Sequence, residues 1–182
     1  MSRQKLVLTY DDYLRMPDDR TRKEIIGGEL FVAAAPSPAH QRVVVHVAAA
    51  LLAAARTHGL GEVLVAPLDV VLSRTDVVQP DVVFVAAPRR AIVGEAAIHG
   101  APDLIVEVVS PSTRKVDRRR KFDLYARAGV AEYWIVDLDG HLVDIYGLAG
   151  GAYRLERRVV EGELARSSRF PQLVVDPAGA WT

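Results

Sequence analysis

The stretch DLIVEVVSPST, residues 103–113, constrains the fold of this chain more than any other segment. Its aliphatic residues form a run that is typical of a central strand buried on both faces of a covered sheet. Glu107 interrupts this run. Because an ionised carboxylate in apolar surroundings costs several kcal/mol unless it is paired, the fold has to supply Glu107 with a partner.

Length and composition indicate one soluble globular domain over residues 1–182, with half of the residues hydrophobic and a quarter charged. Lysine plus arginine total 23, as do aspartate plus glutamate. This balance disfavours a non-specific DNA binder of high affinity but is compatible with a local basic groove. The absence of cysteine excludes disulfides, zinc–thiolate sites and thiol nucleophiles.

No segment of the sequence indicates export or membrane insertion. The N-terminal MSRQKLVLTYDDYL lacks the apolar core of a signal peptide. The most apolar stretch, residues 43–55, is too short to span a bilayer. We therefore expect a cytoplasmic protein that does not contact a membrane.

Hairpins and one strand–helix–strand unit predict an α/β fold with a central mixed sheet and helices packed on it. A hairpin is predicted over residues 23–34, with Gly27-Gly28 supplying the positive φ angles of a tight turn. A helix is predicted from Ser37 as N-cap to Gly59. It is apolar nearly all round between Val43 and Ala55 and is therefore expected to be buried. Further strands are predicted over 62–73, 81–86, 103–110, 131–137, 141–148 and 153–160, with a helix over 115–128. No glycine-rich phosphate loop follows any strand.

Asp81 is the candidate companion of Glu107, because it opens another apolar strand directly after Pro80. Two carboxylates on neighbouring strands can hold one hard divalent cation such as Mg²⁺. Asp103 shares a face of the same strand with Glu107, but at ~3.3 Å per residue the two backbones lie about 13 Å apart. Asp103 is therefore interpreted as a strand-start or turn residue.

Lys121 is the candidate cation. At helical spacing it shares a face with Leu124, Tyr125 and Ala128, which is the apolar face of the predicted helix. Lys115 lies at the start of that helix, about 120° away around the axis. The arginines at 118–120 point around the helix, where they either meet phosphates or form a solvated face.

Each of these residues also has a purely structural interpretation. Glu107 is compatible with a salt bridge in the core, Asp81 with a turn cap, and Lys121 with an ordinary pair to Asp117. His40, in the first turn of the helix after Ser37, is compatible with either a core histidine or a site residue, and the structural interpretation is slightly favoured. From residue types and spacing alone, a metal-dependent hydrolase is one function compatible with the sequence.

Seven segments together resemble the Uma-two family of restriction-endonuclease-like proteins, within the PD-(D/E)XK nuclease superfamily. In chain order they are KEIIGGEL, PSPAHQRVV, GEVLVAPLDVVLS, VVQPDVVFV, APDLIVEVVSPST, DRRRKFDLYARAGVAEYWIVD and FPQL. The resemblance implies a restriction-endonuclease-like α/β core. It also implies Mg²⁺-dependent cleavage of DNA, with Mn²⁺ able to substitute, and a homodimer where both strands are cut.

Site residues follow from the same resemblance. Asp81 matches the aspartate of the superfamily motif and Glu107 matches the acid of the next strand, so both are expected to bind the metal. The superfamily lysine would fall at Val109, and in this family Lys121 takes its place. Glu29 matches an additional family acid that completes the site.

Glu24 is a second candidate for the role given to Glu29. The function expected from the resemblance is hydrolysis of DNA phosphodiesters by a metal-activated water. The alternative is a non-catalytic nuclease-fold module that binds nucleic acid or a protein partner. The sequence does not separate DNA from RNA as substrate.

Overall fold

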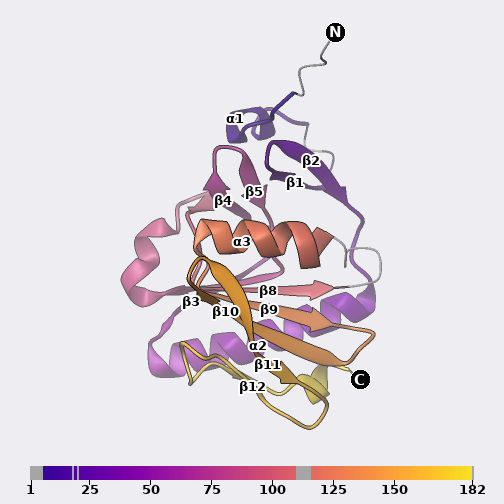
Figure 1. The fold of residues 1–182 in the computed structure, drawn as a ribbon, viewed down its shortest axis with the longest axis vertical. Helices are drawn as coiled ribbons and strands as arrows, with labels where there is room; N and C mark the ends of the chain where they lie inside the picture. The colour runs from indigo at the N-terminus through magenta and orange to yellow at the C-terminus, as the bar shows by residue number, and fades with distance from the viewer. Residues whose placement is uncertain (1–5, 18, 20, 110–115, 182) are drawn as a thin grey trace.

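The computed structural model describes residues 6–17, 19, 21–109 and 116–181, with no side-chain description for 116–118 (Figure 1). The predictions made for Lys115, and for a pair between Lys121 and Asp117, lie outside what it describes. Among the described residues, no helix is both long and apolar enough to cross a membrane.

A six-stranded mixed sheet with the order β11-β10-β9-β8-β6-β3 carries the centre of the fold. Its strands are β3 (Gly61–Val65), β6 (Val82–Ala86), β8 (Leu104–Val109), β9 (Glu132–Asp137), β10 (Leu142–Ala149) and β11 (Ala152–Val159). β8 and β9 pair in parallel, and the other neighbours pair antiparallel. The predicted strand around Glu107 is thus a central strand.

A second sheet, with the order β2-β1-β5-β4-β7, lies beside the first, at the top of Figure 1. Its strands are β1 (Arg22–Ile26), β2 (Glu29–Ala33), β4 (Asp69–Ser73), β5 (Asp76–Val78) and β7 (Ala97–His99). β1 and β2 form the predicted hairpin, in which Gly27 and Gly28 adopt φ of 58° and 76°. The short strands β12 (Ala165–Arg166) and β13 (Val174–Val175) form a separate pair.

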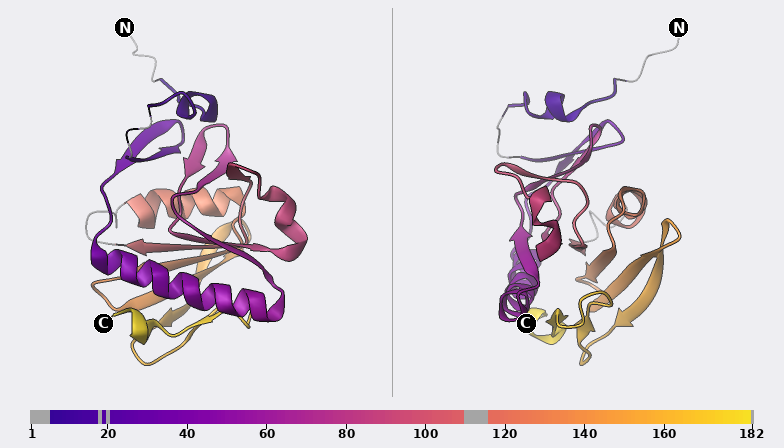
Figure 2. Two further views of the ribbon diagram at one scale, coloured as in Figure 1. Left: turned by 180° about the vertical axis from the view of Figure 1, so that it is seen from behind. Right: turned by 90° about the vertical axis from the view of Figure 1, so that its left-hand side faces the viewer.

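Two helices cover opposite faces of the six-stranded sheet, as the edge-on view in Figure 2 shows. Val82, Phe84 and Val106 belong to the core cluster packed under α2 (Pro38–His58). Val83 and Ile105, which alternate with them along the strands, belong to the cluster under α3 (Phe122–Ala128). Both faces of the central strands are therefore covered, which explains their continuous apolar sequence.

Helix α2 begins and ends where its sequence predicts. The Ser37 hydroxyl accepts a hydrogen bond from the His40 amide, and Gly59 ends the helix with φ of 62°. The expectation that its apolar part is buried holds for one side only. Val43, Val47 and Leu51 are buried, whereas Val45 is 65% exposed. One side of α2 faces the sheet, and β13 and η3 also contact the helix.

The remaining elements are short. They are α1 (Tyr10–Tyr13), η1 (Ala87–Ile92), the π-helical turn η2 (Val116–Lys121) that precedes α3, and η3 (Pro177–Ala180). The predicted α/β class, a central mixed sheet flanked by helices, is confirmed. The helix predicted over 115–128 is observed as η2 followed by α3, and it ends at Gly129 as predicted.

Candidate active site

Asp81 and Glu107 are cross-strand neighbours. The antiparallel register pairs Val82 with Val106, so its continuation by one residue places Asp81 opposite Glu107. Residues directly opposite on antiparallel strands present their side chains on the same face of the sheet. The amide of Val108 also donates to Asp81 Oδ2 at 2.8 Å. The structure thus brings together the two acids singled out in the sequence, and each is only 2% exposed.

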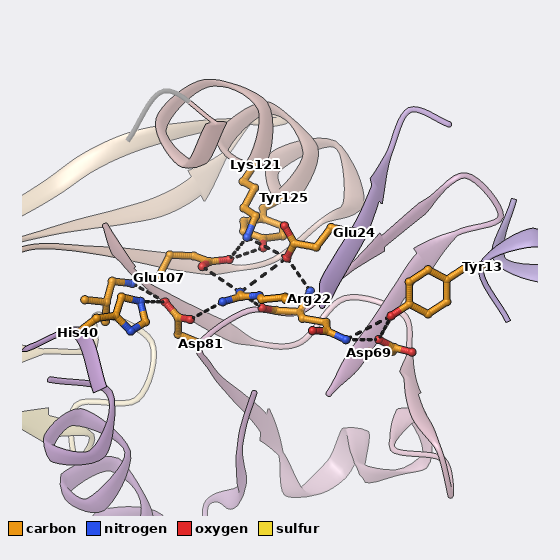
Figure 3. Close-up of polar contacts among 11 residues, drawn as sticks. Tyr13, Arg22, Glu24, His40, Asp69, Asp81, Glu107, Lys121 and Tyr125 are labelled. Atoms are coloured by element: carbon orange, nitrogen blue, oxygen red, sulfur yellow. Dashed lines mark hydrogen bonds and ion pairs between the residues drawn. The ribbon is translucent and has the colours of Figure 1, made fainter. Parts of the chain in front are cut away.

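Strand β1 of the other sheet adds Arg22 and Glu24, which share a face because they are two residues apart. The Arg22 guanidinium lies between three carboxylates (Figure 3). Its Nη1 is 3.0 Å from Asp81 Oδ1, and its Nη2 is 3.9 Å from Glu107 Oε2 and 3.7 Å from Glu24 Oε1. Nη2 also donates to the carbonyl of Gln79.

Lys121 reaches the same acids from the helical side. Its ammonium nitrogen lies 2.8 Å from Glu107 Oε1 and 3.0 Å from Glu24 Oε1, and the residue is 2% exposed. The apolar neighbours Leu124 and Tyr125 are buried with it, as the helical spacing predicts. Lys121 is the last residue of the π-helical turn η2, which positions its side chain beside the carboxylates.

Tyr125 completes the environment of Glu107. Its hydroxyl donates to Glu107 Oε1 at 2.7 Å, and its side chain is fully buried. Burial raises the pKa of Tyr125 well above its ordinary value, and the charges of Glu107 and Glu24 raise it further. The phenol therefore stays protonated and remains a donor to Glu107.

His40 holds Asp81 from the other side of the site. Its Nε2 lies 3.2 Å from Asp81 Oδ2, and the Ser37 cap fixes the backbone of His40 in the first turn of α2. Burial favours a raised pKa for Asp81, but the hydrogen bond from His40 and the charge of Arg22 outweigh it and lower that pKa. Asp81 is thus held as a carboxylate. The interpretation of His40 as merely structural is incomplete, because it contacts a candidate site residue.

A pocket of about 600 Å³ opens onto this group of residues. Arg22, His40 and Asp81 contribute to its wall together with Gln79, and apolar residues such as Leu14 provide much of the remainder. Arg22 Nε, His40 Nδ1 and Gln79 Oε1 are buried without a hydrogen-bond partner within the part of the chain that the structure describes. All three atoms belong to residues of the pocket wall. Buried polar atoms normally have a hydrogen-bond partner, so a bound ligand that rearranges this wall could supply one.

An outer layer of hydrogen bonds extends from the acids to helix α1. The Gln79 amide donates to Glu24 Oε1 at 2.8 Å, and its side-chain nitrogen donates to Asp69 Oδ1 at 2.8 Å. The Tyr13 hydroxyl donates to the same oxygen of Asp69, also at 2.8 Å (Figure 3). Glu24 is thus held by Gln79, which directly follows β5, and the Gln79 side chain is in turn held by Asp69 of β4 and Tyr13 of α1.

Two other sequence candidates lie elsewhere. Glu29 pairs with Arg120 at 3.1 Å, and none of its described contacts reaches Asp81, Glu107 or Lys121. Asp103 caps the start of β8 as predicted, because it accepts from the Ala86 amide at 2.8 Å and pairs with Arg89 at 2.9 Å. The side chain of Arg120 is half exposed and lies over the ring of Phe31.

The family model Uma2, described as "Putative restriction endonuclease", matches residues 10–178. The chain belongs to the Uma2 family. The resemblance that the sequence motifs indicate is therefore confirmed, and with it the description of this Uma2 protein as nuclease-like. No curated protein matches the sequence significantly.

Solved structures show that this Uma2 protein shares its fold with another chain. A crystal structure described as a putative nuclease belonging to DUF820, from Anabaena variabilis ATCC 29413, matches with a TM-score of 0.77 at 16% identity. The match covers 96% of this chain and 97% of that chain. The type IIG restriction endonuclease BpuSI matches with a TM-score of 0.41 at 16% identity, over 72% of this chain and 14% of that chain.

The donors of this Uma2 site fit a hard divalent cation. Among the described residues, no three histidine, aspartate or glutamate side chains are arranged as a metal cage. Mg²⁺ does not require one, because it is usually bound through one or two carboxylates together with water and substrate phosphate. Asp81 and Glu107 offer two buried carboxylates that already face one cation, the guanidinium of Arg22.

Arg22 is the residue of this Uma2 site that sequence reasoning missed. A signal for it was present, because Arg22 and Glu24 occupy alternate positions of a predicted strand and so share one face. Charged residues on the face of a strand that also carries Ile26 indicate a polar site rather than solvent. The same alternation favours Glu24, which is 5% exposed, as the acid of this hairpin that contacts Lys121, at 3.0 Å.

Proposed function

We propose that this Uma2 protein is a metal-dependent nuclease that hydrolyses phosphodiester bonds in DNA. One observation carries the proposal: the buried carboxylates of Asp81 and Glu107 lie opposite each other and face the guanidinium of Arg22 beside a pocket. Asp81 and Glu107 would hold Mg²⁺ or Mn²⁺. The bound ion would polarise the scissile phosphate and lower the pKa of a coordinated water.

The protein's own residues would keep the carboxylates ionised and in place. His40 and the Val108 amide hold one oxygen of Asp81, and Lys121 with Tyr125 holds one oxygen of Glu107. In this proposal the Lys121 ammonium also stabilises negative charge that builds on the phosphate. Lys121 would thus take the role of the superfamily lysine, whose motif position is occupied by Val109 in this chain.

Glu24 rather than Glu29 is the additional acid in this proposal. Glu24 Oε1 accepts from Lys121 at 3.0 Å and from the Gln79 amide at 2.8 Å, and thereby fixes the ammonium beside Glu107. Glu29 lies opposite Ile26 in the hairpin, two residues further along β1 than Glu24, which is about 7 Å of strand. That separation explains why Glu29 pairs with Arg120.

The decisive experiment measures cleavage of supercoiled plasmid by the purified chain with Mg²⁺ or Mn²⁺, with EDTA as the metal-free control. Asp81→Asn and Glu107→Gln each remove one anionic ligand at nearly constant shape. Since metal ligation is worth several kcal/mol of transition-state stabilisation, each variant should cut at least about a hundredfold more slowly. Asp103→Asn is the matched control, because Asp103 is a buried aspartate of the same strand region that pairs with Arg89.

The outcomes separate the proposal from its alternatives. Cleavage that persists in both acid variants would show that the activity belongs to another site or to a contaminant. Binding of DNA without cleavage by the unaltered chain would favour a non-catalytic nuclease-fold module. Faster cleavage of RNA than of DNA would change the substrate. Lys121→Met should lose cleavage and still bind metal, because removal of a positive charge does not weaken the attraction for a cation.

A further inference from the structure

Arg22 is the only residue among those described that contacts Asp81, Glu107 and Glu24 together. Its side chain is 23% exposed, whereas the three carboxylates are nearly completely buried. We propose that Arg22 is a built-in counter-ion that competes with the divalent metal for Asp81 and Glu107 and so sets the metal affinity of the site. This inference rests on the proposed function only in taking Asp81 and Glu107 as metal ligands.

The cluster needs such a counter-ion because carboxylates that are removed from water are strongly destabilised when unpaired. Lys121 serves Glu107 and Glu24, but none of its described contacts reaches Asp81. Asp81 instead meets Arg22 at 3.0 Å and His40 at 3.2 Å. Arg22 therefore supplies the permanent positive charge nearest to Asp81 among the described residues.

The oxygen atoms that Arg22 contacts explain why it competes with a metal rather than assisting it. Asp81 Oδ2 accepts from Val108 and contacts His40, while Glu107 Oε1 accepts from Lys121 and Tyr125. Arg22 contacts the other oxygen of each acid, Oδ1 of Asp81 and Oε2 of Glu107. A cation bound by both acids through these oxygens would lie within a few ångströms of the guanidinium, and like charges at that separation repel strongly inside a protein.

The pocket gives Arg22 a direction in which to withdraw. Arg22 is part of the pocket wall, and its Nε has no hydrogen-bond partner among the described residues. Withdrawal of the guanidinium toward the pocket would break its hydrogen bonds to Asp81 and to the Gln79 carbonyl, but none at Nε. Metal binding and the Arg22 ion pairs would then exclude each other, as linkage requires of two cations that compete for one set of ligands.

The test measures Mn²⁺ binding to the full chain by isothermal titration calorimetry, in the absence of nucleic acid. Arg22→Gln removes the charge and should tighten Mn²⁺ binding at least about tenfold, since the metal no longer displaces a cation. Arg22→Lys keeps a charge but loses the planar fork that spans several oxygens, so its affinity should fall between the two. Mn²⁺ should also raise the melting temperature of Arg22→Gln more than that of the unaltered chain.

Arg89→Gln is the matched control. Arg89 pairs with the buried carboxylate of Asp103 at 2.9 Å, four residues before Glu107 in the chain, or about 13 Å along the strand. Its loss removes the same charge far from the candidate ligands and should leave Mn²⁺ affinity unchanged.

Equal or weaker Mn²⁺ binding by Arg22→Gln would overturn the inference, as would the absence of Mn²⁺ binding by every variant. If Arg22→Gln does not fold, Mn²⁺ binding by Arg22→Lys that is no tighter than that of the unaltered chain would overturn it equally. Plasmid cleavage separates this result from the fate of the proposed function. Tighter binding without cleavage by any variant would support the counter-ion and reject the nuclease, whereas metal-dependent cleavage with unchanged affinity would do the reverse.

Discussion

At the scale of single residues, Tyr125 combines complete burial with a hydrogen bond to an ionised partner, Glu107. We predict that Tyr125→Phe lowers the free energy of unfolding by about 1.5–3 kcal/mol in EDTA, because hydrogen bonds to charged groups lie in that range. Lys121 still binds Glu107 in the variant, so the fold should persist. Urea denaturation followed by circular dichroism measures the change.

Tyr153→Phe is the control for this prediction. Burial raises the pKa of Tyr153 as well, and its hydroxyl donates to the neutral carbonyl of Val130 at 2.9 Å. The loss of a bond between neutral groups should cost only about 0.5–1.5 kcal/mol. If Tyr153→Phe is as costly as Tyr125→Phe, the charge of Glu107 does not strengthen the bond to Tyr125.

The sequence could indicate Asp81 and Glu107 because each is a charged residue at or within an apolar strand. The choice between Glu24 and Glu29 could not be made in the same way, since both acids stand in one short hairpin, Glu24 in β1 and Glu29 in β2. Arg22 was missed because two of its three acid partners, Asp81 and Glu107, are 59 and 85 positions away in the chain. Their roles in catalysis stay predictions.

At the scale of elements, the β1–β2 hairpin positions Arg22 and Glu24, so substitutions in its turn are expected to affect stability. We predict that Gly27→Asn changes the free energy of unfolding by less than about 0.5 kcal/mol, because Asn-Gly is the preferred pair for a turn with two positive φ angles. Gly28→Asn should lower the free energy of unfolding by at least about 1–2 kcal/mol, because the residue at this position adopts φ of 76° and its added Cβ would collide with Val7.

The pair is matched because a Cβ at Gly27 meets no atom within 4 Å. Urea denaturation of the two variants gives the comparison directly. Equal costs at both positions would mean that contact with Val7 does not constrain the turn.

Caps and turns were the elements most readable from the sequence, since Ser37, Gly59 and Gly129 act through local backbone geometry. The exposure of Val45 could not be predicted, because nearly every residue of the run 43–55 is small or aliphatic and the sequence therefore shows no preferred buried face. The π-helical turn before α3 was also missed. Such turns have no residue signature comparable to a cap, although they often occur at functional sites.

At the scale of the whole molecule, the candidate site lies where the two sheets meet. β1 contributes Arg22 and Glu24, the β6–β8 pair contributes Asp81 and Glu107, and the helical segment after β8 contributes Lys121. No short motif contains these residues, so only the complete topology assembles them. This explains why local patterns predicted the fold class and singled out Asp81, Glu107 and Lys121, but did not reveal their contacts with Arg22 and Glu24.

The oligomeric state of the protein determines how both strands of a DNA duplex would be cut. The described residues form one acid cluster per chain, so a single chain acting by the proposed function cuts one strand at a time. We predict that the chain is a homodimer when it cuts both strands, so the rate of linear product should rise more steeply with protein concentration than the rate of nicking. Plasmid gels over a dilution series measure both rates, and light scattering on the same samples measures the mass. Linear product formed in direct proportion to protein at the 19.9 kDa mass of one chain would contradict the dimer, because two cuts would then come from one cluster acting twice.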